Sequence, residues 1–267
     1  MQGLGNDFIV VNCLEENCPE LAARAAQLCD RRFGIGCDQL LVIRPSERAD
    51  FKMEIFNNDG SQVEMCGNGI RCVAQYLAKH GATTKSELAI ETLAGIIRPR
   101  LLGDRVEVDM GEPILDGKKI PTTLEGKIVD NPLTVDGRHL RITCVSMGNP
   151  HCVIFVEDTA QAAVTALGPI LEKHPMFPKR VNVEFAQVLS PSEIALRVWE
   201  RGAGETLACG TGASATLVAA VITGKAQREA VLHLKGGDLQ IRWSEKNNRV
   251  YMTGPGEEVF SGSIDIN

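Results

Sequence analysis

The sequence predicts an α+β protein made of two similar halves. Two short loops carry this prediction, Cys66-Gly67-Asn68-Gly69 and Cys209-Gly210-Thr211-Gly212, because each stands just before an apolar segment with helical character. Short segments with turn signals between them surround both loops and are typical of strands. A chain of 267 residues is long enough for two medium domains. We therefore expect two similar domains, with an active site in the cleft between them where the two helix starts meet.

The N-terminal half is expected to contain two helices. One should cover about residues 20–31 after Pro19, and the other residues 70–80, where apolar residues follow helical spacing and Gly81 is suited to end the helix. Strands are expected at residues 8–11, 40–43, 51–56, 87–92, 96–101 and 105–109, with a turn at Leu102-Gly103-Asp104.

The C-terminal half repeats this organisation after a turn-rich connection at residues 111–132. Helices are expected at about residues 160–173 and 213–223, and the second is small or apolar on all sides, so it should be buried inside a wrap of strands. Strands are expected at residues 140–146, 152–156, 180–188, 194–200, 231–235, 239–243 and 249–253, with a hairpin at Gly236-Gly237. We assign residues 1–112, joined by a C-terminal strand at residues 255–267, to one domain and residues 113–254 to the other.

The composition excludes several classes of protein. Hydrophobic residues make up 44%, charged residues 23%, and the net charge is −6, so there is no basic excess for nucleic acid. No run of about 18 apolar residues is present, and the first residues lack the pattern of a secretory signal. We expect a cytoplasmic protein that binds neither nucleic acid nor a membrane.

Nine cysteines are scattered along the chain without a C-x-x-C pair or a histidine at zinc-finger spacing. This pattern argues against a disulfide scaffold and against a metal site. Most of the nine are expected to be buried thiols, because cysteine packs like a small apolar residue. Cys66 and Cys209 are the exceptions.

Their loops favour acid–base chemistry. The glycines allow a ligand to approach the main chain, and the N–H groups of a first helical turn would bind a carboxylate. The same field favours a thiolate, which is then a usable base. One thiolate and one thiol on opposite faces of an α-carbon would invert a stereocentre without metal or cofactor.

Several polar residues fit this hypothesis to different degrees. Asn57 and Glu200 each end an apolar stripe along a strand, which suits either a ligand contact or an internal hydrogen bond. His151 follows a turn and would either tune a nearby thiol or serve the structure. Arg201 is either a surface charge or a clamp for a second carboxylate.

Together these residues resemble the diaminopimelate epimerase family, whose members act in lysine and peptidoglycan precursor biosynthesis. The resemblance covers nearly the whole chain and rests on the two cysteine loops with six further motifs. These are Gly3-Leu4-Gly5-Asn6-Asp7-Phe8, Gly36-Cys37-Asp38-Gln39, Asn57-Asn58-Asp59-Gly60-Ser61, Gly148-Asn149-Pro150-His151 and Val181-Asn182-Val183-Glu184, besides Glu200-Arg201-Gly202-Ala203-Gly204-Glu205-Thr206 before the second loop. Family members usually carry several more residues before the first motif, so the edge strand beside Asn6 is expected to be short or missing.

The resemblance implies that Cys66 and Cys209 are the acid–base pair for exchange between LL- and meso-2,6-diaminopimelate, with His151 and Glu200 modulating the two thiols. It implies a pseudo-symmetric pair of domains, each a mixed or antiparallel, barrel-like β wrap around a central helix, and a homodimer with Phe260 at the interface. It also implies a set of substrate contacts, namely Asn6, Gln39, Asn57, Gly67, Asn68, Asn149, Asn182, Glu200, Arg201, Gly210 and Thr211.

Three alternatives stay open at this point. The nearest is a related cofactor-independent racemase of proline or hydroxyproline, against which Asn68 and Arg201 argue. From other classes come a hydrolase with a cysteine nucleophile activated by His151, and a protein that uses the two thiols as a redox switch.

Overall fold

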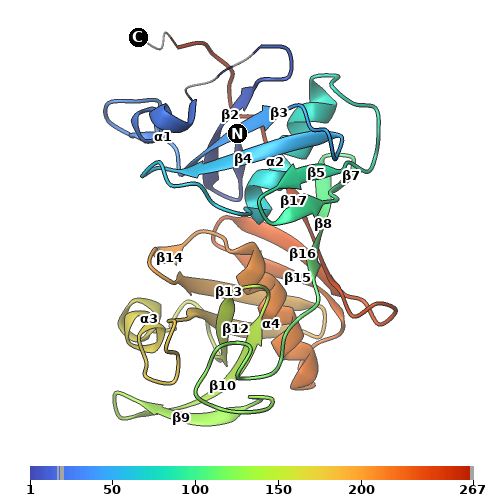
Figure 1. The fold of residues 1–267 in the computed structure, drawn as a ribbon. Coiled ribbons are helices and arrows are strands. Elements are labelled where there is room, and N and C mark those ends of the chain that lie inside the picture. Colours follow the sequence, from blue (N-terminus) through green and yellow to red (C-terminus); the bar gives the residue numbers. More distant parts are fainter. Residues whose placement is uncertain (17, 19–20, 265–267) are drawn as a thin grey trace. The chain divides into compact units, whose positions relative to one another are not determined.

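The computed structural model describes residues 1–16, 18 and 21–264, and this part of the chain confirms the predicted α+β class. It forms two compact units (Figure 1). Unit 1 contains Met1–Val108 and the segment that begins at Gly254, and unit 2 contains Asp109–Thr253. The chain passes from unit 1 to unit 2 within strand β8 (Arg105–Gly111) and returns within strand β17 (Val250–Pro255). None of the described helices is long and apolar enough to cross a membrane.

Unit 1 is built on a six-stranded sheet in the order β1-β2-β3-β4-β5-β6. Its strands are β1 (Gln2–Gly3), β2 (Asn6–Asn12), β3 (Gln39–Arg44), β4 (Phe51–Asn57), β5 (Ile90–Thr92) and β6 (Gly95–Ile97). Alternation along β3 places Leu40 and Val42 in a buried cluster with helix α1 (Leu21–Cys29). Leu41 lies against the start of helix α2 (Gly67–Lys79) instead. Each face of β3 is therefore covered by one helix.

Helix α2 forms where helical spacing predicts it. Ile70, Val73 and Leu77 recur at intervals of three and four residues and are fully buried. His80 is the C-cap residue of α2, and Gly81 follows with φ +72°, a conformation that glycine adopts without strain.

Unit 2 holds most of an 11-stranded sheet in the order β7-β8-β17-β16-β15-β13-β12-β11-β10-β9, with β14 paired to β13. The strands not yet named are β7 (Arg100–Leu102), β9 (Asn131–Val135), β10 (Arg138–Ser146), β11 (Pro150–Phe155), β12 (Asn182–Ser190), β13 (Glu193–Glu200), β14 (Gly204–Thr206), β15 (Glu229–Leu234) and β16 (Gly237–Trp243). Strand β7 belongs to unit 1. The predicted hairpin at Gly236-Gly237 is confirmed, because Leu234 pairs with Gly237.

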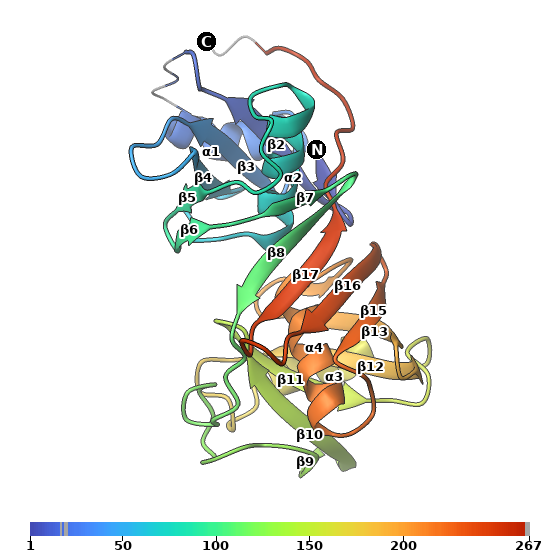
Figure 2. The same cartoon turned by 90° about the vertical axis from the view of Figure 1, so that its right-hand side faces the viewer.

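Helix α4 (Gly210–Ile222) is buried on all sides, as its composition predicts. It contacts β10, β11 and β12 as well as β15 and β16, so strands wrap around it (Figure 2). The hydroxyls of Ser214 and Thr216 donate to the carbonyls of Gly210 and Gly212 at 2.9 and 2.8 Å. These internal hydrogen bonds satisfy the only two polar side chains of the helix's buried stretch, Gly212–Ala220.

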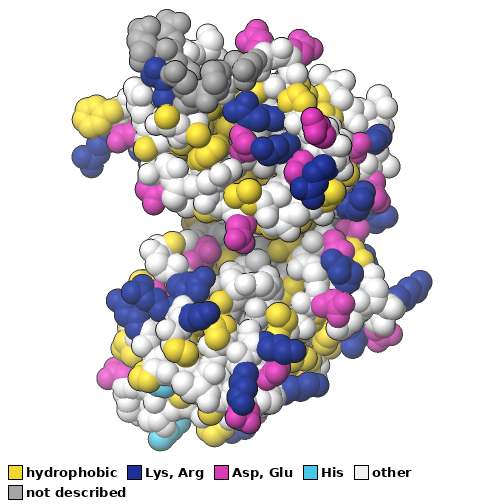
Figure 3. Space-filling view, viewed as in Figure 1, with side chains coloured by type: hydrophobic (Ala, Val, Ile, Leu, Met, Phe, Trp, Pro, Cys, Tyr) yellow, Lys and Arg dark blue, Asp and Glu magenta, His cyan; other side chains and the backbone are white. Residues whose placement is uncertain are grey.

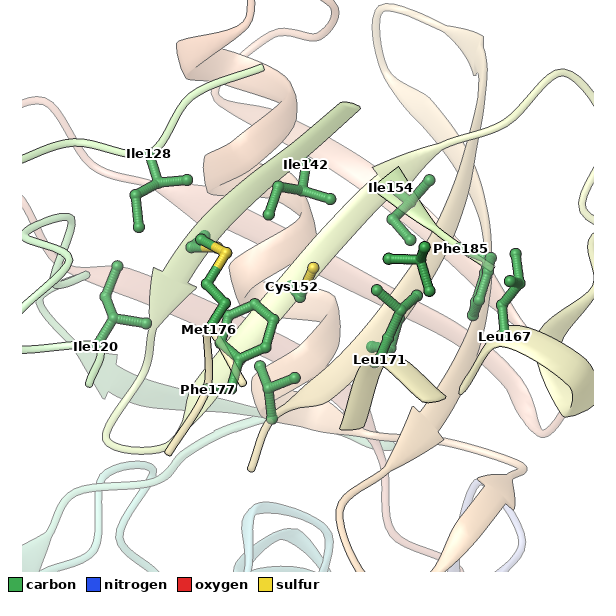
Figure 4. Close-up of a cluster of buried hydrophobic side chains, with 14 of the residues drawn as sticks. Ile120, Ile128, Ile142, Cys152, Ile154, Leu167, Leu171, Met176, Phe177 and Phe185 are labelled. Atoms are coloured by element: carbon green, nitrogen blue, oxygen red, sulfur yellow. The ribbon is translucent and has the colours of Figure 1, made fainter. Parts of the chain in front are cut away.

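A second core lies on the other face of β11 and β12. Helix α3 (Val164–Glu172) packs Leu167 and Leu171 against Phe185 and Ile154, with Phe177 next to them (Figure 4). Val183 and Phe185 of β12 point into this cluster, so Asn182 and Glu184, which alternate with them, point to the face that α4 covers.

Some predicted strands differ from the observed ones. Residues 96–101 form two strands, β6 and β7, because Pro99 lacks the N–H that a continuous ladder needs. The expected strand at residues 255–267 ends at Pro255, and beyond it only Glu257 bridges to Gln2, while residues 258–264 are irregular. Strands β1, β9 and β14 were not predicted. The expected helix start at Pro19 lies outside the described residues.

Acidic and basic side chains occur together on both units (Figure 3). Several form ion pairs within one unit, such as Arg44 with Glu54 at 2.6 Å and Arg197 with Glu205 at 2.8 Å. Pairs of this kind near the surface each stabilise a protein by less than about 1 kcal/mol. The buried hydrophobic clusters within each unit, rather than these ion pairs, provide most of its stability.

Gly168 of α3 leaves no room for a side chain. A Cβ atom at this position would lie 2.5 Å from Cγ of Trp199, whose indole is fixed because Nε1 donates to Glu172 at 2.9 Å. We expect Gly168→Ala to lower the free energy of unfolding by about 2 kcal/mol, measured by urea denaturation. Gly262→Ala is the control, because no atom lies within 4 Å of its added Cβ. Equal stability of the two variants would contradict this account of the packing.

Candidate active site

Each unit carries one of the two predicted cysteines at the start of its helix. Cys66 caps α2 with φ −137° and ψ 113°, and Cys209 caps α4 with φ −132° and ψ 108°. Both helices have 13 residues, and each is followed by a glycine with positive φ. The two loops therefore build the same local structure, in which the N–H groups of the first turn are available to an anion.

In unit 1 the Cys66 sulfur lies between a donor and an acceptor. The amide of Gly69 donates to Sγ at 3.4 Å, and the thiol lies 3.8 Å from Asn6 Oδ1. Asn68 Nδ2 donates to the same oxygen at 3.3 Å, while Asn6 Nδ2 donates to Asp38 at 2.7 Å. Cys66 thus has a donor for its thiolate and an acceptor for its thiol, as a group that gains and loses a proton requires.

Gln39 and Asn57 complete this group of residues. They face each other across β3 and β4, and Gln39 Nε2 donates to Asn57 Oδ1 at 2.9 Å. Two buried oxygens, Gln39 Oε1 and Asn68 Oδ1, have no hydrogen-bond partner among the described residues. Buried acceptors are normally paired, so these two oxygens are suited to receive the N–H donors of a bound molecule.

In unit 2 the Cys209 sulfur lies 3.5 Å from Thr211 Oγ1, and Asn149 Nδ2 donates to that hydroxyl at 3.2 Å. His151 stands behind Asn149, with Nε2 2.9 Å from Asn149 Oδ1. Its other ring nitrogen, Nδ1, lies 2.7 Å from Glu184 Oε1. His151 and Glu184 are both fully buried, so Cys209 is linked to a buried ionisable pair.

The remaining predicted contacts of unit 2 lie at the ends of β12 and β13. Asn182 Nδ2 donates to the carbonyl of Pro150 at 3.0 Å, and its oxygen accepts from the amide of Arg201 at 2.9 Å. Glu200 accepts a hydrogen bond from Thr206 at 2.6 Å. The side chain of Arg201 is exposed and donates to the carbonyl of Lys179 at 3.0 Å.

The surroundings of Cys209 favour its protonated form. Burial raises the pKa of the Cys209 thiol well above its usual value, and the carboxylates of Glu200 and Glu184 raise it further. The hydrogen bond with Thr211 opposes them by lowering the pKa. Burial also raises the pKa of Cys13, Cys37 and Cys72 to about 12, so these thiols are not reactive at neutral pH.

Strand register shows that the two groups are built alike. Phe8 pairs with Gln39 across the parallel strands β2 and β3, and His151 pairs with Asn182 across the parallel strands β11 and β12. Phe8 and His151 therefore occupy equivalent positions in the two units. Asn6, two residues before Phe8, corresponds to Asn149, two residues before His151. By the same count, further positions correspond in order: Gln39 and Asn182, Leu41 and Glu184, Asn57 and Glu200, Cys66 and Cys209, Gly67 and Gly210, Asn68 and Thr211.

The predicted site residues therefore gather in two groups. The Cys66 group contains Asn6, Gln39, Asn57, Cys66, Gly67 and Asn68, and the Cys209 group contains Asn149, His151, Asn182, Glu200, Arg201, Cys209, Gly210 and Thr211. Phe260 belongs to neither group, since it lies in the irregular C-terminal segment with 70% of its surface exposed.

Sequence reasoning missed Glu184. A signal was present, because Glu184 shares one face of its strand with Asn182 and Ala186 while Val183 and Phe185 form the apolar face. A carboxylate in the middle of such a strand is as unusual as one at its end. Within residues 1–16, 18 and 21–264, no three His, Cys, Asp or Glu side chains are grouped as a metal site would need.

Comparison with known proteins identifies the family to which the chain belongs. A family model described as diaminopimelate epimerase matches residues 1–115 and 143–259. The chain belongs to the diaminopimelate epimerase family. It is 55% identical to the diaminopimelate epimerase of Moorella thermoacetica, over all of this chain and 98% of that protein. It is 52% identical to the one of Acetivibrio thermocellus, with the same coverage.

A solved structure confirms the two-domain fold expected for the diaminopimelate epimerase family. It is described as a probable proline racemase from Agrobacterium radiobacter with bound carbonate, and it matches with a TM-score of 0.64 over 92% of this chain and 81% of that chain. At 17% identity the likeness concerns the fold alone. The fold is therefore shared by proteins named for different substrates.

Proposed function

We propose that this protein is a cofactor-independent epimerase that interconverts LL- and meso-2,6-diaminopimelate in lysine and peptidoglycan precursor biosynthesis. The observation that carries the proposal is the pair of matched cysteines, each capping a buried helix in its own unit. Full-length identity above 50% to proteins named diaminopimelate epimerase supports this substrate.

In the proposed mechanism the Cys66 group and the Cys209 group act on the same substrate. One cysteine, as thiolate, removes the α-proton, and the other, as thiol, delivers a proton to the opposite face. The first-turn N–H groups of α2 and α4 stabilise the charge that develops on the substrate carboxylate. The roles of the two cysteines exchange in the reverse direction.

The other predicted residues bind and orient the substrate. The oxygens of Gln39 and Asn68 are suited to accept from its ammonium groups. Asn6, Asn57, Asn149 and Asn182 are further substrate contacts, and Arg201 is suited to bind the distal carboxylate. No cofactor is needed for these steps.

Deuterium exchange tests the function directly. The protein is incubated with LL-diaminopimelate in deuterated water, and α-deuteration and formation of the meso isomer are followed by mass spectrometry and chiral chromatography. We expect one deuterium for each molecule epimerised. Absence of both signals above background would refute the proposal, and turnover of proline instead would indicate the related racemase.

A hydrolase with a cysteine nucleophile is less well supported. Such an enzyme needs a base within hydrogen-bond reach of the thiol. Both ring nitrogens of His151 are already engaged, by Glu184 at 2.7 Å and Asn149 at 2.9 Å. His151 thus acts on Cys209 only through Asn149 and Thr211.

Glu200 gives a prediction for the pH dependence. Its carboxylate is, after burial, the largest cause of the raised pKa of Cys209. Glu200→Gln removes this negative charge and so lowers that pKa. Because the mechanism needs one protonated thiol, the decline of kcat/KM on the basic side should begin at lower pH than in the wild type. Glu193→Gln, at the exposed start of the same strand, should leave the profile unchanged, and identical profiles for all three proteins would contradict the role of Glu200.

We also propose that the protein is a cytoplasmic homodimer with Phe260 at the interface. The side chains of Val259 and Phe260 are 65% and 70% exposed. Neighbouring apolar side chains with this exposure are suited to a protein contact.

A further inference from the structure

The Cys66 and Cys209 groups differ in chemistry at one buried pair of positions. In unit 1 these positions hold Phe8 and Leu41, which are 3% and 0% exposed. In unit 2 they hold His151 and Glu184, both fully buried. The strand registers are the same, so the same place in the same fold accommodates an apolar pair in one unit and an ionisable pair in the other.

The ionisable pair does not serve stability. Burying two ionisable groups carries a desolvation penalty, and replacement by apolar side chains of similar size is often neutral or stabilising. Unit 1 shows that an apolar solution exists at this position. Glu184 Oε2 is moreover buried without a hydrogen-bond partner in the described part of the chain, which adds to the penalty. The pair therefore has a role other than holding the fold.

Hydrogen bonds connect this pair to the Cys209 sulfur. The chain runs from Glu184 Oε1 to His151 Nδ1 (2.7 Å) and from His151 Nε2 to Asn149 Oδ1 (2.9 Å). It continues from Asn149 Nδ2 to Thr211 Oγ1 (3.2 Å) and ends at Cys209 Sγ (3.5 Å). Glu184 also lies against the first turn of α4, since a Cβ on Gly212 would be 2.9 Å from Oε1.

The orientation of the Asn149 amide indicates where the protons of this pair lie. Asn149 Nδ2 donates to Thr211, so Asn149 Oδ1 faces His151 and accepts from Nε2–H. A second proton must lie between Nδ1 and Glu184 Oε1, because two lone pairs would otherwise oppose each other at 2.7 Å. The pair thus holds two protons and is neutral overall. Thr211, which already accepts from Asn149, has its own hydroxyl proton available to the sulfur.

We propose that Glu184 is a positioning residue for the epimerisation, which holds the second proton on the buried pair and so aims the Thr211 hydroxyl at Cys209. The inference rests on the proposed function of the two cysteines. Without the Glu184 carboxylate, His151 adopts either neutral form, Asn149 turns freely, and the Thr211 proton is no longer directed at the sulfur. Unit 1 has no counterpart, because Phe8 and Leu41 cannot form such a chain. The other titratable groups that face the pair are Glu200, Cys152 and Cys209.

Two variants test the role of Glu184. Glu184→Gln keeps the shape of the side chain, but the amide can present either its oxygen or its N–H to Nδ1 of His151. We expect kcat to fall about 10- to 100-fold with little change in KM, since misplacement of a reacting group has effects of this size. The double variant His151→Phe with Glu184→Leu copies the pair of unit 1, so it should fold with a melting temperature at or above that of the wild type and lose at least as much kcat.

A spectroscopic readout separates positioning from structure. In ¹H–¹⁵N NMR spectra of the histidine rings, the wild type should show a proton on Nε2 of His151 and a strongly hydrogen-bonded proton at Nδ1, and Glu184→Gln should lose the second signal. Glu172→Gln is the matched control. Glu172 is another buried carboxylate of unit 2, 4% exposed, but it bonds Trp199 and Gly202 instead. It should lower stability and leave both His151 protons and the kcat of the folded protein unchanged.

Two results would overturn the inference: a kcat of Glu184→Gln or of the double variant within twofold of the wild type, or loss of the Nδ1 signal in the Glu172→Gln control. Failure of the proposed function is recognisable separately, because the wild type would then not epimerise diaminopimelate while the His151 signals still report on the pair.

Discussion

Replacing either Cys66 or Cys209 with serine should lower the rate of epimerisation by about 10³-fold or more, within the range found when a general acid or base is lost. A serine hydroxyl fits the same place but is a far weaker acid than a thiol, so it supplies neither the base nor the acid. The rate of meso formation from LL-diaminopimelate measures the loss, and α-deuteration shows whether proton abstraction still occurs.

Cys18→Ser is the control for this experiment. Cys18 is half-buried, its sulfur lies 3.7 Å from the carbonyl of Glu16, and it belongs to neither group. It should keep full activity. A serine variant of Cys66 or Cys209 with more than a few per cent of wild-type activity would refute the two-base mechanism, even if the protein epimerises its substrate.

Gly212→Ala should have the second largest effect, a fall in kcat of about 100-fold. The added Cβ would lie 2.9 Å from Glu184 Oε1 and 3.3 Å from Cys209 Sγ. Neither group can retreat, because Glu184 is fully buried and Cys209 is 5% exposed. The methyl group would therefore push apart the carboxylate and the sulfur at the start of α4.

Gly69→Ala is the matched variant in unit 1. There the added Cβ would lie 3.2 Å from the methyl groups of Leu41, a contact that a small shift relieves without breaking a hydrogen bond of the leucine side chain. We expect less than a tenfold loss of kcat, measured with the same assay. Equal losses in the two variants would show that the difference between Leu41 and Glu184 has no consequence at these helix starts.

Much of the fold follows from local sequence. Helices α2 and α4 could be predicted because an apolar run follows each cysteine loop, and the end of α2 because Gly81 follows. Both helices begin three residues before the predicted start, at the glycine after the cysteine. Strand β9 escaped prediction because Pro132 interrupts its pattern, and β14 because three residues are too few to show one. Such short strands owe their existence to the neighbour they pair with.

The site was predictable where a residue breaks a pattern at the end of an element, as Asn57 and Glu200 do. Glu184 stands in the middle of a strand, and its importance depends on which helix covers that face and on the histidine of the neighbouring strand. Both facts come from tertiary structure. The pairing of His151 with a carboxylate rather than with a thiol could not be read from spacing along the chain.

The division of unit 1 into two stretches of sequence sets an order of events during synthesis. Unit 2 is continuous from Asp109 to Thr253, so all of it comes from one stretch of the chain. Unit 1 also needs residues that follow unit 2, because Arg71 of α2 donates to the carbonyl of Pro255 at 2.9 Å and Gln2 pairs with Glu257. Unit 1 can therefore be completed only after the whole of unit 2 has been synthesised, although Cys66 is made long before Cys209.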